Sequence, residues 1–276
     1  CLKPPAAAKI SAMLKGKVCL TELRLNNNEL CEGIGHLGKV LSQNNYLTSL
    51  ALAANALDDR SIKLLAEGLR GNNGLLHLDL SDNKVGAHGV SYLSGALHVN
   101  VSLQTLDLQQ NDLDLTVAAS LADCVRKNSS LQTMHLGFPR SSGSAPGPAW
   151  PISVQHLRKL VGSTSEVSLN LEKMGLSGLD AAFLAQLLEG NTSITELKLA
   201  GNQLGTTGVT RLGDFLKSAL ALRKLDLRRN TLGPAAAAAL GRALKTNTSL
   251  RSLDLGENRV GNEGAINLAE GLTINK

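Results

Sequence analysis

A pattern of apolar residues, LxxLxLxxNxL, repeats along most of the chain and constrains its fold more than any other feature. It occurs as LTELRLNNNEL, LTSLALAANAL, LLHLDLSDNKV, LQTLDLQQNDL, ITELKLAGNQL, LRKLDLRRNTL and LRSLDLGENRV. The second apolar position falls at Leu23, Leu50, Leu78, Leu106, Met134, Leu169, Leu197, Leu225 and Leu253. Successive positions are 27 or 28 residues apart, except for one step of 35 residues after Met134. Such a period is typical of a solenoid built from stacked units.

Each repeat predicts a short strand, a tight turn and a helix. Leucines two residues apart, as in LDL, point to one face of an extended chain, and the residue between them points to solvent. The asparagine that follows the strand predicts a turn and a ladder of side-chain hydrogen bonds from one coil to the next. After the turn, Val90, Leu93 and Leu97 are spaced three and four residues apart, which predicts a helix packed on the strands.

These repeats resemble the leucine-rich repeats of the ribonuclease-inhibitor type, whose long units carry a full helix. The resemblance implies an α/β fold, a curved solenoid or horseshoe with a parallel β-sheet on the concave face and α-helices on the convex face. Thin coils stacked about 4.8 Å apart favour slim side chains, which fits 55 leucines and only six aromatic residues. We therefore expect residues 1–276 to form a single domain of about nine repeats.

The repeat pattern is incomplete at both ends of the chain and is interrupted once in its middle. Residues 6–18 and the final AINLAEGLTINK both resemble the helix of a repeat, so we expect the chain to be truncated within a repeat at both ends. Residues 137–151 contain four prolines and three glycines, which predicts an irregular loop insertion. That loop carries Phe138 and the single tryptophan, Trp150. Both are candidate contact residues, and the alternative is a neutral insertion in a tolerant loop.

The titratable residues match no catalytic or metal-binding motif. The six histidines are scattered, and the sequence has no GxxxxGK[ST] phosphate loop, no HExxH and no EF-hand loop. The four cysteines form no CxxC pair. We therefore expect no enzyme activity, no cofactor, no metal and no small-molecule substrate.

Composition narrows the class of partner. No stretch approaches the roughly 20 apolar residues of a membrane helix, so we expect no membrane insertion. A net charge of +5 and a pI near 9.1 are typical of nucleic-acid-binding proteins. However, the basic excess is spread along the chain and has no aromatic platform beside it, which argues against nucleic acid. We expect protein partners instead.

The sequence also predicts where the protein works. No signal peptide and no disulfide framework are visible, so we expect an intracellular, cytoplasmic location, including cytoskeletal or ciliary sites. Four glycosylation sequons recur at one position of the repeat, which favours a structural role over glycosylation; they begin at Asn100, Asn128, Asn191 and Asn247.

The repeat register predicts which side chains the concave face presents. Basic residues gather in repeats seven and eight, where we expect Lys198 to pair with Asp226 across the strands and Glu196 to lie near Lys224. Local neutralisation and a basic contact surface are both open interpretations of this region. The candidate partner-binding residues are Arg24, Asp79, Asp107, His135, Asn170, Lys198, Lys224, Asp226, Arg228 and Arg229.

The sequence thus predicts a non-catalytic protein–protein interaction module or scaffold that presents its concave surface to a protein partner. Two alternatives follow from further resemblances. The repeats are similar to those of Ran GTPase-activating proteins, which implies a GTPase-activating regulator, although this sequence shows no acidic tail. They are also similar to the ligand-sensing repeats of NLR-type immune receptors. Fold resemblance alone does not choose among these functions.

Overall fold

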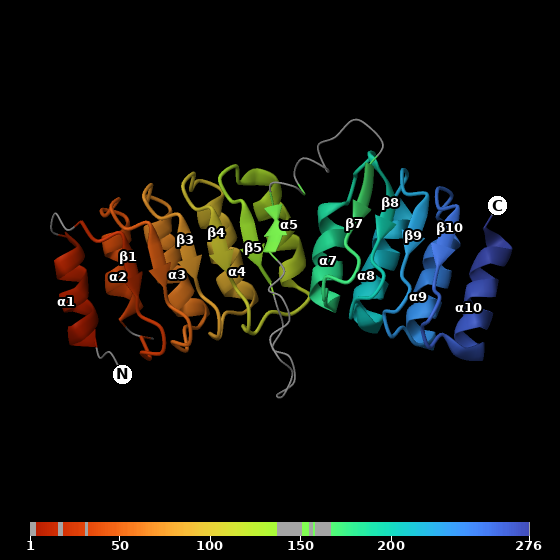
Figure 1. Cartoon of the computed structure of the whole chain (residues 1–276), viewed down its shortest axis with the longest axis horizontal. Coiled ribbons are helices and arrows are strands. Elements are labelled where there is room, and N and C mark those ends of the chain that lie inside the picture. Colours follow the sequence, from red (N-terminus) through yellow and green to blue (C-terminus); the bar gives the residue numbers. More distant parts are fainter. Residues whose placement is uncertain are drawn as a thin grey trace. The chain divides into compact units, whose positions relative to one another are not determined.

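The computed structural model describes residues 4–15, 19–30, 33–136, 151–154, 157 and 167–275. The chain divides into two compact units. Unit 1 comprises Cys1–Ala145 and Pro151–Gln155, and unit 2 comprises Pro146–Trp150 and His156–Lys276. Strands and helices alternate along the chain in both units (Figure 1). A single domain over residues 1–276 stays a prediction.

Unit 1 has short strands on one side and helices on the other. Its described helices are α1 (Pro4–Lys15), α2 (Ile34–Leu41), α3 (Asp59–Leu69), α4 (Ala87–Leu97) and α5 (Val117–Lys127). Its sheet contains β1 (Glu22–Arg24), β2 (Ser49–Ala51), β3 (His77–Asp79), β4 (Thr105–Asp107), β5 (Thr133–His135) and β6 (Pro151–Ser153). Strands β1 to β5 are parallel and follow chain order, and each helix packs against the next.

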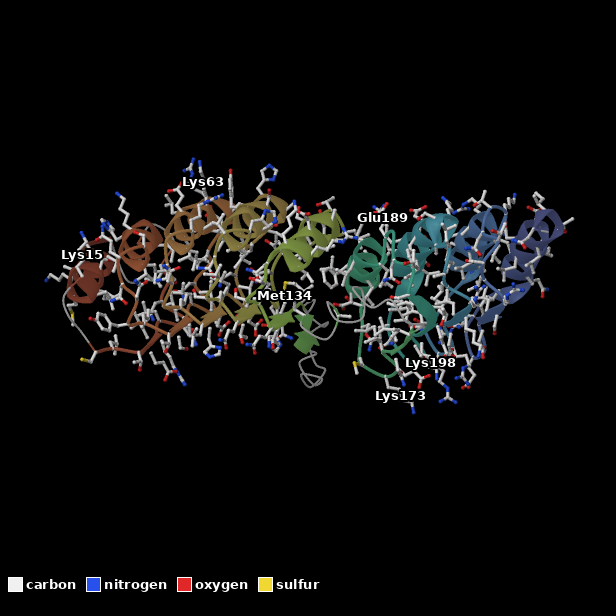
Figure 2. All side chains as sticks on the ribbon, turned by 90° about the horizontal axis from the view of Figure 1, so that it is seen from above. Lys15, Lys63, Met134, Lys173, Glu189 and Lys198 are labelled. Carbon is white, nitrogen blue, oxygen red and sulfur yellow. The ribbon has the colours of Figure 1, made fainter. Side chains whose placement is uncertain are left out.

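Unit 2 repeats the same arrangement. Its parallel sheet contains β7 (Val167–Asn170), β8 (Ile194–Lys198), β9 (Lys224–Asp226) and β10 (Ser252–Asp254). Its described helices are α7 (Gly178–Leu187), α8 (Gly205–Ser218), α9 (Pro234–Leu244) and α10 (Gly261–Ile274). Figure 2 shows the two layers: Lys63 and Glu189 lie on the helix sides of units 1 and 2, and Lys198 lies on the strand side of unit 2. The predicted α/β solenoid is confirmed in both units.

The strand register is the one that the repeats predict. The inward-facing row runs through Leu23, Leu50, Leu78, Leu106 and Met134 in unit 1, and through Leu169, Leu197, Leu225 and Leu253 in unit 2. All are buried except Leu23 and Leu253, which lie in β1 and β10 and are partly exposed. Burial of one such side chain contributes roughly 1.5–3 kcal/mol, so stacking of the coils stabilises both units.

One strand departs from the single parallel sheet that the sequence predicted. Strand β6 runs antiparallel to β5, with Pro151 opposite His135 and Ser153 opposite Thr133. The expectation of irregular structure up to residue 151 is therefore wrong at its last residue. Proline lacks an N–H group and is tolerated at the first residue of an edge strand, which is where Pro151 lies. Among the described strands, β6 and β7 belong to different sheets.

Buried or partly buried asparagines after the strands connect successive coils, as predicted. Asn55 Nδ2 donates to the carbonyl of Leu25 in the preceding coil at 2.8 Å and to that of Leu52 in its own coil at 2.9 Å. Its Oδ1 accepts the N–H of Asn28 at 3.0 Å. The other members that bond to the preceding coil are Asn83, Asn111, Asn202, Asn230 and Asn258.

A second asparagine ladder precedes the strands. Asn100 Nδ2 donates to the carbonyls of Leu69 and Asn72, both at 2.8 Å, and its Oδ1 accepts the N–H of Leu103 at 2.9 Å. The same bonds to the preceding coil recur at Asn72, Asn128, Asn247 and Asn275. Three sequon asparagines, Asn100, Asn128 and Asn247, belong to this ladder and are at most 3% exposed. Their predicted structural role is confirmed.

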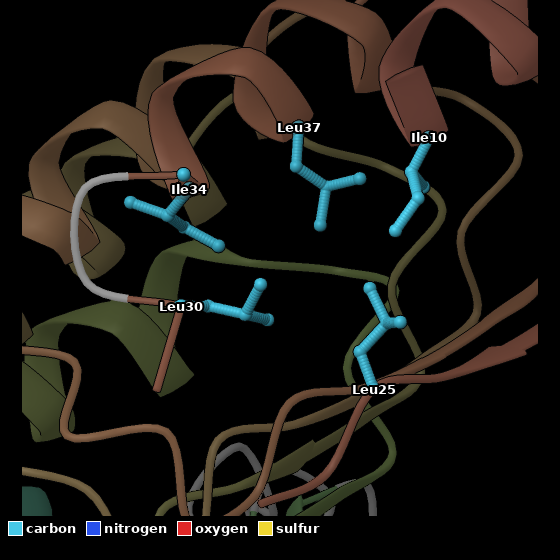
Figure 3. A pocket seen from close by; sticks show the side chains of 6 residues that line it. Ile10, Leu25, Leu30, Ile34 and Leu37 are labelled. Carbon is cyan, nitrogen blue, oxygen red and sulfur yellow. The ribbon is translucent and has the colours of Figure 1, made fainter. Parts of the chain in front are cut away.

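A small cavity in unit 1 has only apolar lining. The side chains of Ile10, Leu25, Leu30, Ile34 and Leu37 surround it, between α1, α2 and the β1 coil (Figure 3). Without a convergent polar group such a cavity cannot orient a ligand, so we regard it as a packing defect.

Within the described residues, no helix combines the length and the apolar character needed to cross a membrane.

Candidate functional site

The candidate site lies on the strand faces. Many of the acidic side chains there accept hydrogen bonds from nearby backbone N–H groups. Asp79 Oδ1 accepts the N–H and the hydroxyl of Ser81 at 2.9 and 2.7 Å. Asp107, Asp226, Asp254 and Asn170 accept the N–H two residues later in the same way. These bonds satisfy backbone donors where the strand turns. They also hold each side chain in a fixed orientation on the face.

Position 51 lacks this side-chain acceptor, because an alanine occupies it. The N–H of Ala53, which an aspartate at 51 would bind, instead donates to Oδ1 of Asn26 in the preceding coil at 2.9 Å. The backbone donor is thus satisfied from a different strand. This compensation explains why Ala51 is compatible with the turn, and it leaves the β2 part of the face small and uncharged.

Unit 1 brings three of the predicted residues together. Asp79, Asp107 and His135 are successive neighbours in the register of β3, β4 and β5. Burial raises the pKa of Asp107, and the neighbouring Asp79 carboxylate raises it further; the Gln109 N–H and His135 act in the opposite direction. Nδ1 of His135 is buried and has no hydrogen-bond partner among the described residues.

Arg24 lies apart from these three residues. It is in register with Ala51 in β2, and its Nε forms an ion pair with Oε1 of Glu22 at 2.6 Å. Both side chains are at least half exposed, where such pairs contribute at most about 1 kcal/mol. The arginine is therefore neutralised locally and remains accessible.

Unit 2 contains the other predicted residues, and two of its arginines are neutralised. The Arg228 guanidinium binds both oxygens of Asp226, with Nη2 at 2.7 Å from Oδ2, and its Nε lies 3.3 Å from Asp254. Arg229 Nε lies 2.7 Å from Glu257. The hydrogen bond from Arg228 lowers the pKa of Asp226, and that from Arg229 lowers the pKa of Glu257. Local neutralisation is therefore the correct interpretation for Arg228 and Arg229.

The predicted ion pair between Lys198 and Asp226 is wrong, although the two residues are neighbours in the register. Asp226 binds Arg228 instead. The guanidinium reaches both carboxylate oxygens from two residues along the same coil, and bidentate arginine pairs are stronger than single lysine contacts. Lys198 forms no ion pair with a residue that the structure describes.

Four cations in or directly before strands β8 to β10 form no ion pair with a described residue: Lys198, Arg223, Lys224 and Arg251. Arg223 and Arg251 immediately precede β9 and β10, and both are exposed. Sequence reasoning missed these two arginines because it followed only the strand positions. Their signal was present, since both occupy the second position of the repeat in LRKLDL and LRSLDL.

The predicted loop contacts lie outside the described residues. This applies to Phe138 and Trp150, and to residues 137–150 of the predicted loop.

Among the residues that are described, no three His, Cys, Asp or Glu side chains are placed to hold a metal ion. The described strand faces therefore present a row of acids beside an imidazole in unit 1 and a group of unpaired cations in unit 2.

Comparison with known proteins identifies the repeats. Five stretches match the family model described as leucine-rich repeat: residues 43–66, 71–94, 190–213, 221–241 and 246–269. No curated protein matches the chain. The solved structure of leiomodin-1 actin-binding site 2 is similar at 20% identity, with a TM-score of 0.42 over 49% of this chain and 78% of that one. The tropomodulin C-terminal domain of Caenorhabditis elegans is similar at 18% identity, with a TM-score of 0.42 over 56% and 87%.

Proposed function

We propose that this chain, with leucine-rich repeats in both of its units, is a non-catalytic module that binds a protein partner on its strand faces. One observation carries the proposal: Lys198, Arg223, Lys224 and Arg251 on the strand side of unit 2 form no ion pair with a described residue. These charges do not stabilise the fold through ion pairs. They are therefore free to meet complementary groups of a partner, which is how charged surfaces select and orient proteins.

The rigidity of the coils supports this proposal. Two asparagine ladders bond each coil to its neighbour, and parallel strands about 4.8 Å apart repeat the same side-chain positions. A partner thus meets side chains that are already ordered, which lowers the entropy lost on binding. The long coils, each with a full helix, favour repeats of the ribonuclease-inhibitor type. No described residue favours GTPase activation or ligand sensing, so those alternatives stay predictions.

The proposal is tested by two charge-matched double variants. Arg24→Glu with Lys224→Glu reverses one cation on the strand side of each unit, whereas Lys39→Glu with Arg242→Glu reverses one exposed helix cation in each unit. Proteins retained from a cell extract by each immobilised chain are quantified by mass spectrometry. We expect a set of proteins that the wild type and the helix variant retain and that the strand variant loses. Loss on the helix variant alone, or no specific retention, would contradict the proposal.

A further inference from the structure

Three of these cations lie together at the end of unit 2 where strands β9 and β10 begin, and we define the basic edge as Arg223, Lys224 and Arg251. Arg223 and Arg251 occupy the same position on adjacent coils, and the N–H of Arg251 donates to the carbonyl of Arg223 at 2.8 Å. Lys224 follows Arg223 directly, and all three are exposed. Like charges on neighbouring strands destabilise a sheet, so an anion bound there would relieve this repulsion.

The acid that the register places beside the basic edge is already bound elsewhere. Glu196 is in register with Lys224, yet its Oε2 accepts the hydroxyl of Ser168 on the opposite neighbour, β7, at 2.8 Å. This contact leaves Lys224 without its expected partner. The positive charge of Lys224 at the basic edge is therefore a consequence of a specific contact between its neighbours.

We propose that the basic edge binds an extended, acidic peptide segment of the partner; the inference rests on the proposed function and specifies its partner. The arginine guanidinium matches a carboxylate through two parallel hydrogen bonds. Arg223 and Arg251 repeat this donor group on adjacent coils. Side chains of an extended peptide that point to one face repeat about every 6.6 Å, which allows successive acids to reach successive coils.

The same face favours a peptide over a nucleic acid. Single strands bind proteins by stacking bases on exposed aromatic rings, but the described aromatic residues of unit 2, Phe183 and Phe215, are both buried.

The test uses a fluorescein-labelled peptide of six Glu-Thr pairs and measures fluorescence anisotropy against the whole chain. We expect saturable binding that weakens as salt increases, and no binding of the neutral analogue with Gln in place of Glu. Arg223→Glu with Arg251→Glu should raise the Kd at least tenfold. The milder Arg223→Gln with Arg251→Gln should raise it severalfold and guards against a folding defect.

The matched control is Arg242→Glu with Lys245→Glu, which changes the charge of unit 2 by the same amount at exposed positions of α9 and its C-cap. Its Kd should stay within twofold of the wild type. Equal losses in both double variants, or no binding of the acidic peptide, would overturn the inference. Tighter binding of a twenty-residue oligothymidine would also overturn it. If extract proteins still depend on the strand face in these cases, the proposed function stands without the acidic-peptide specificity.

Discussion

At the residue scale, the asparagine ladder that precedes the strands is interrupted at residue 219 in the described part of unit 2. Residue 219 occupies the ladder position 28 residues before Asn247, and it is an alanine that is 6% exposed. Its backbone angles, φ −73° and ψ 112°, are close to those of the ladder asparagines Asn128 and Asn275. Its carbonyl accepts from Asn247 Nδ2. The backbone at 219 is thus arranged for an asparagine whose hydrogen bonds are missing.

Ala219→Asn should therefore stabilise the protein. By the spacing of the other rungs, the new amide would donate to the carbonyls of Leu188 and Asn191, and a net gain of about 1 kcal/mol is expected for such hydrogen bonds. Urea unfolding measures the free energy. Ala219→Leu adds a comparable side chain without these bonds and should destabilise by overpacking. Equal changes in the free energy of unfolding for Ala219→Asn and Ala219→Leu would show that an asparagine at position 219 does not form the hydrogen bonds of the ladder.

Asp180 is the buried acid whose protonation the structure perturbs most. It lies in the first turn of α7, is 3% exposed, and completes a capping box with Ser177. Its Oδ2 accepts the N–H of Ser177 at 2.7 Å, whereas Oδ1 is buried with no partner among the described residues. Burial raises the pKa of Asp180 to about 6, and the hydrogen bonds from Ser177 offset only part of this effect.

A raised pKa makes the folded state bind this proton more tightly than the unfolded state does, so ionisation of Asp180 destabilises the fold. Stability should fall as pH rises from about 4 to about 6 and should then level off. Between pH 5 and pH 7.5 the loss from this group is about 1 kcal/mol. Asp180→Asn should remove that slope in urea unfolding, whereas the exposed Asp112→Asn should keep it. Parallel slopes for wild type and Asp180→Asn would refute the assignment.

At the element scale, glycines let neighbouring helices approach closely. A Cβ atom on Gly68 of α3 would come within 2.0 Å of the carbonyl oxygen of Gly38 in α2, and one on Gly271 of α10 within 2.2 Å of that of Gly241 in α9. The segment AEGL marks this position in α3 and in α10. Glycine normally weakens a helix, so its presence here reflects the backbone of the adjacent helix.

Gly68→Ala should destabilise unit 1 by about 1–3 kcal/mol, because a backbone carbonyl cannot move aside as a side chain does. Gly95 of α4 is the control, since a Cβ there would meet only the flexible guanidinium of Arg70, at 3.1 Å. Gly95→Ala should be neutral or stabilise the helix by up to about 1 kcal/mol. Thermal unfolding of both variants separates helix propensity from close approach. A stabilising Gly68→Ala would show that the helices can separate at no cost.

At the scale of the whole molecule, the sequence correctly predicted the features that follow from the repeat period, above all the strand register. All nine inward positions from Leu23 to Leu253 occupy the predicted register, because a leucine spacing of two residues specifies which face of a strand is buried. The antiparallel β6 was not predicted, since proline and glycine content indicates turns but not strand direction. Helix contacts at single glycines were also missed, because they depend on the neighbouring backbone.

The candidate site was only partly predictable for a similar reason. The register correctly placed Lys198 beside Asp226 and Glu196 beside Lys224. It did not determine which donor each carboxylate binds, because a long side chain chooses among neighbours along its own coil and on both adjacent strands. Asp226 binds Arg228, and Glu196 accepts from Ser168. The charges that remain free are thus set by side-chain geometry rather than by position in the repeat.

The stacking of coils also predicts how much each leucine of the inward-facing row contributes to stability. In a solenoid each coil is stabilised by its immediate neighbours, so the same residue should matter more between two coils than at the last described strand. Leu197 and Leu225 are at most 2% exposed, whereas Leu253 in β10 is partly exposed and has no described strand on its other side. Leu225→Ala should cost about 2–5 kcal/mol.

Leu197→Ala should match that loss, and Leu253→Ala should cost less than half of it in urea unfolding of the same chain. All three substitutions remove the same atoms from the same row, so any difference reports the contact with neighbouring coils. A loss at Leu253 equal to that at Leu225 would mean that another part of the protein covers β10. It would also show that unit 2 is not stabilised by nearest-neighbour stacking alone.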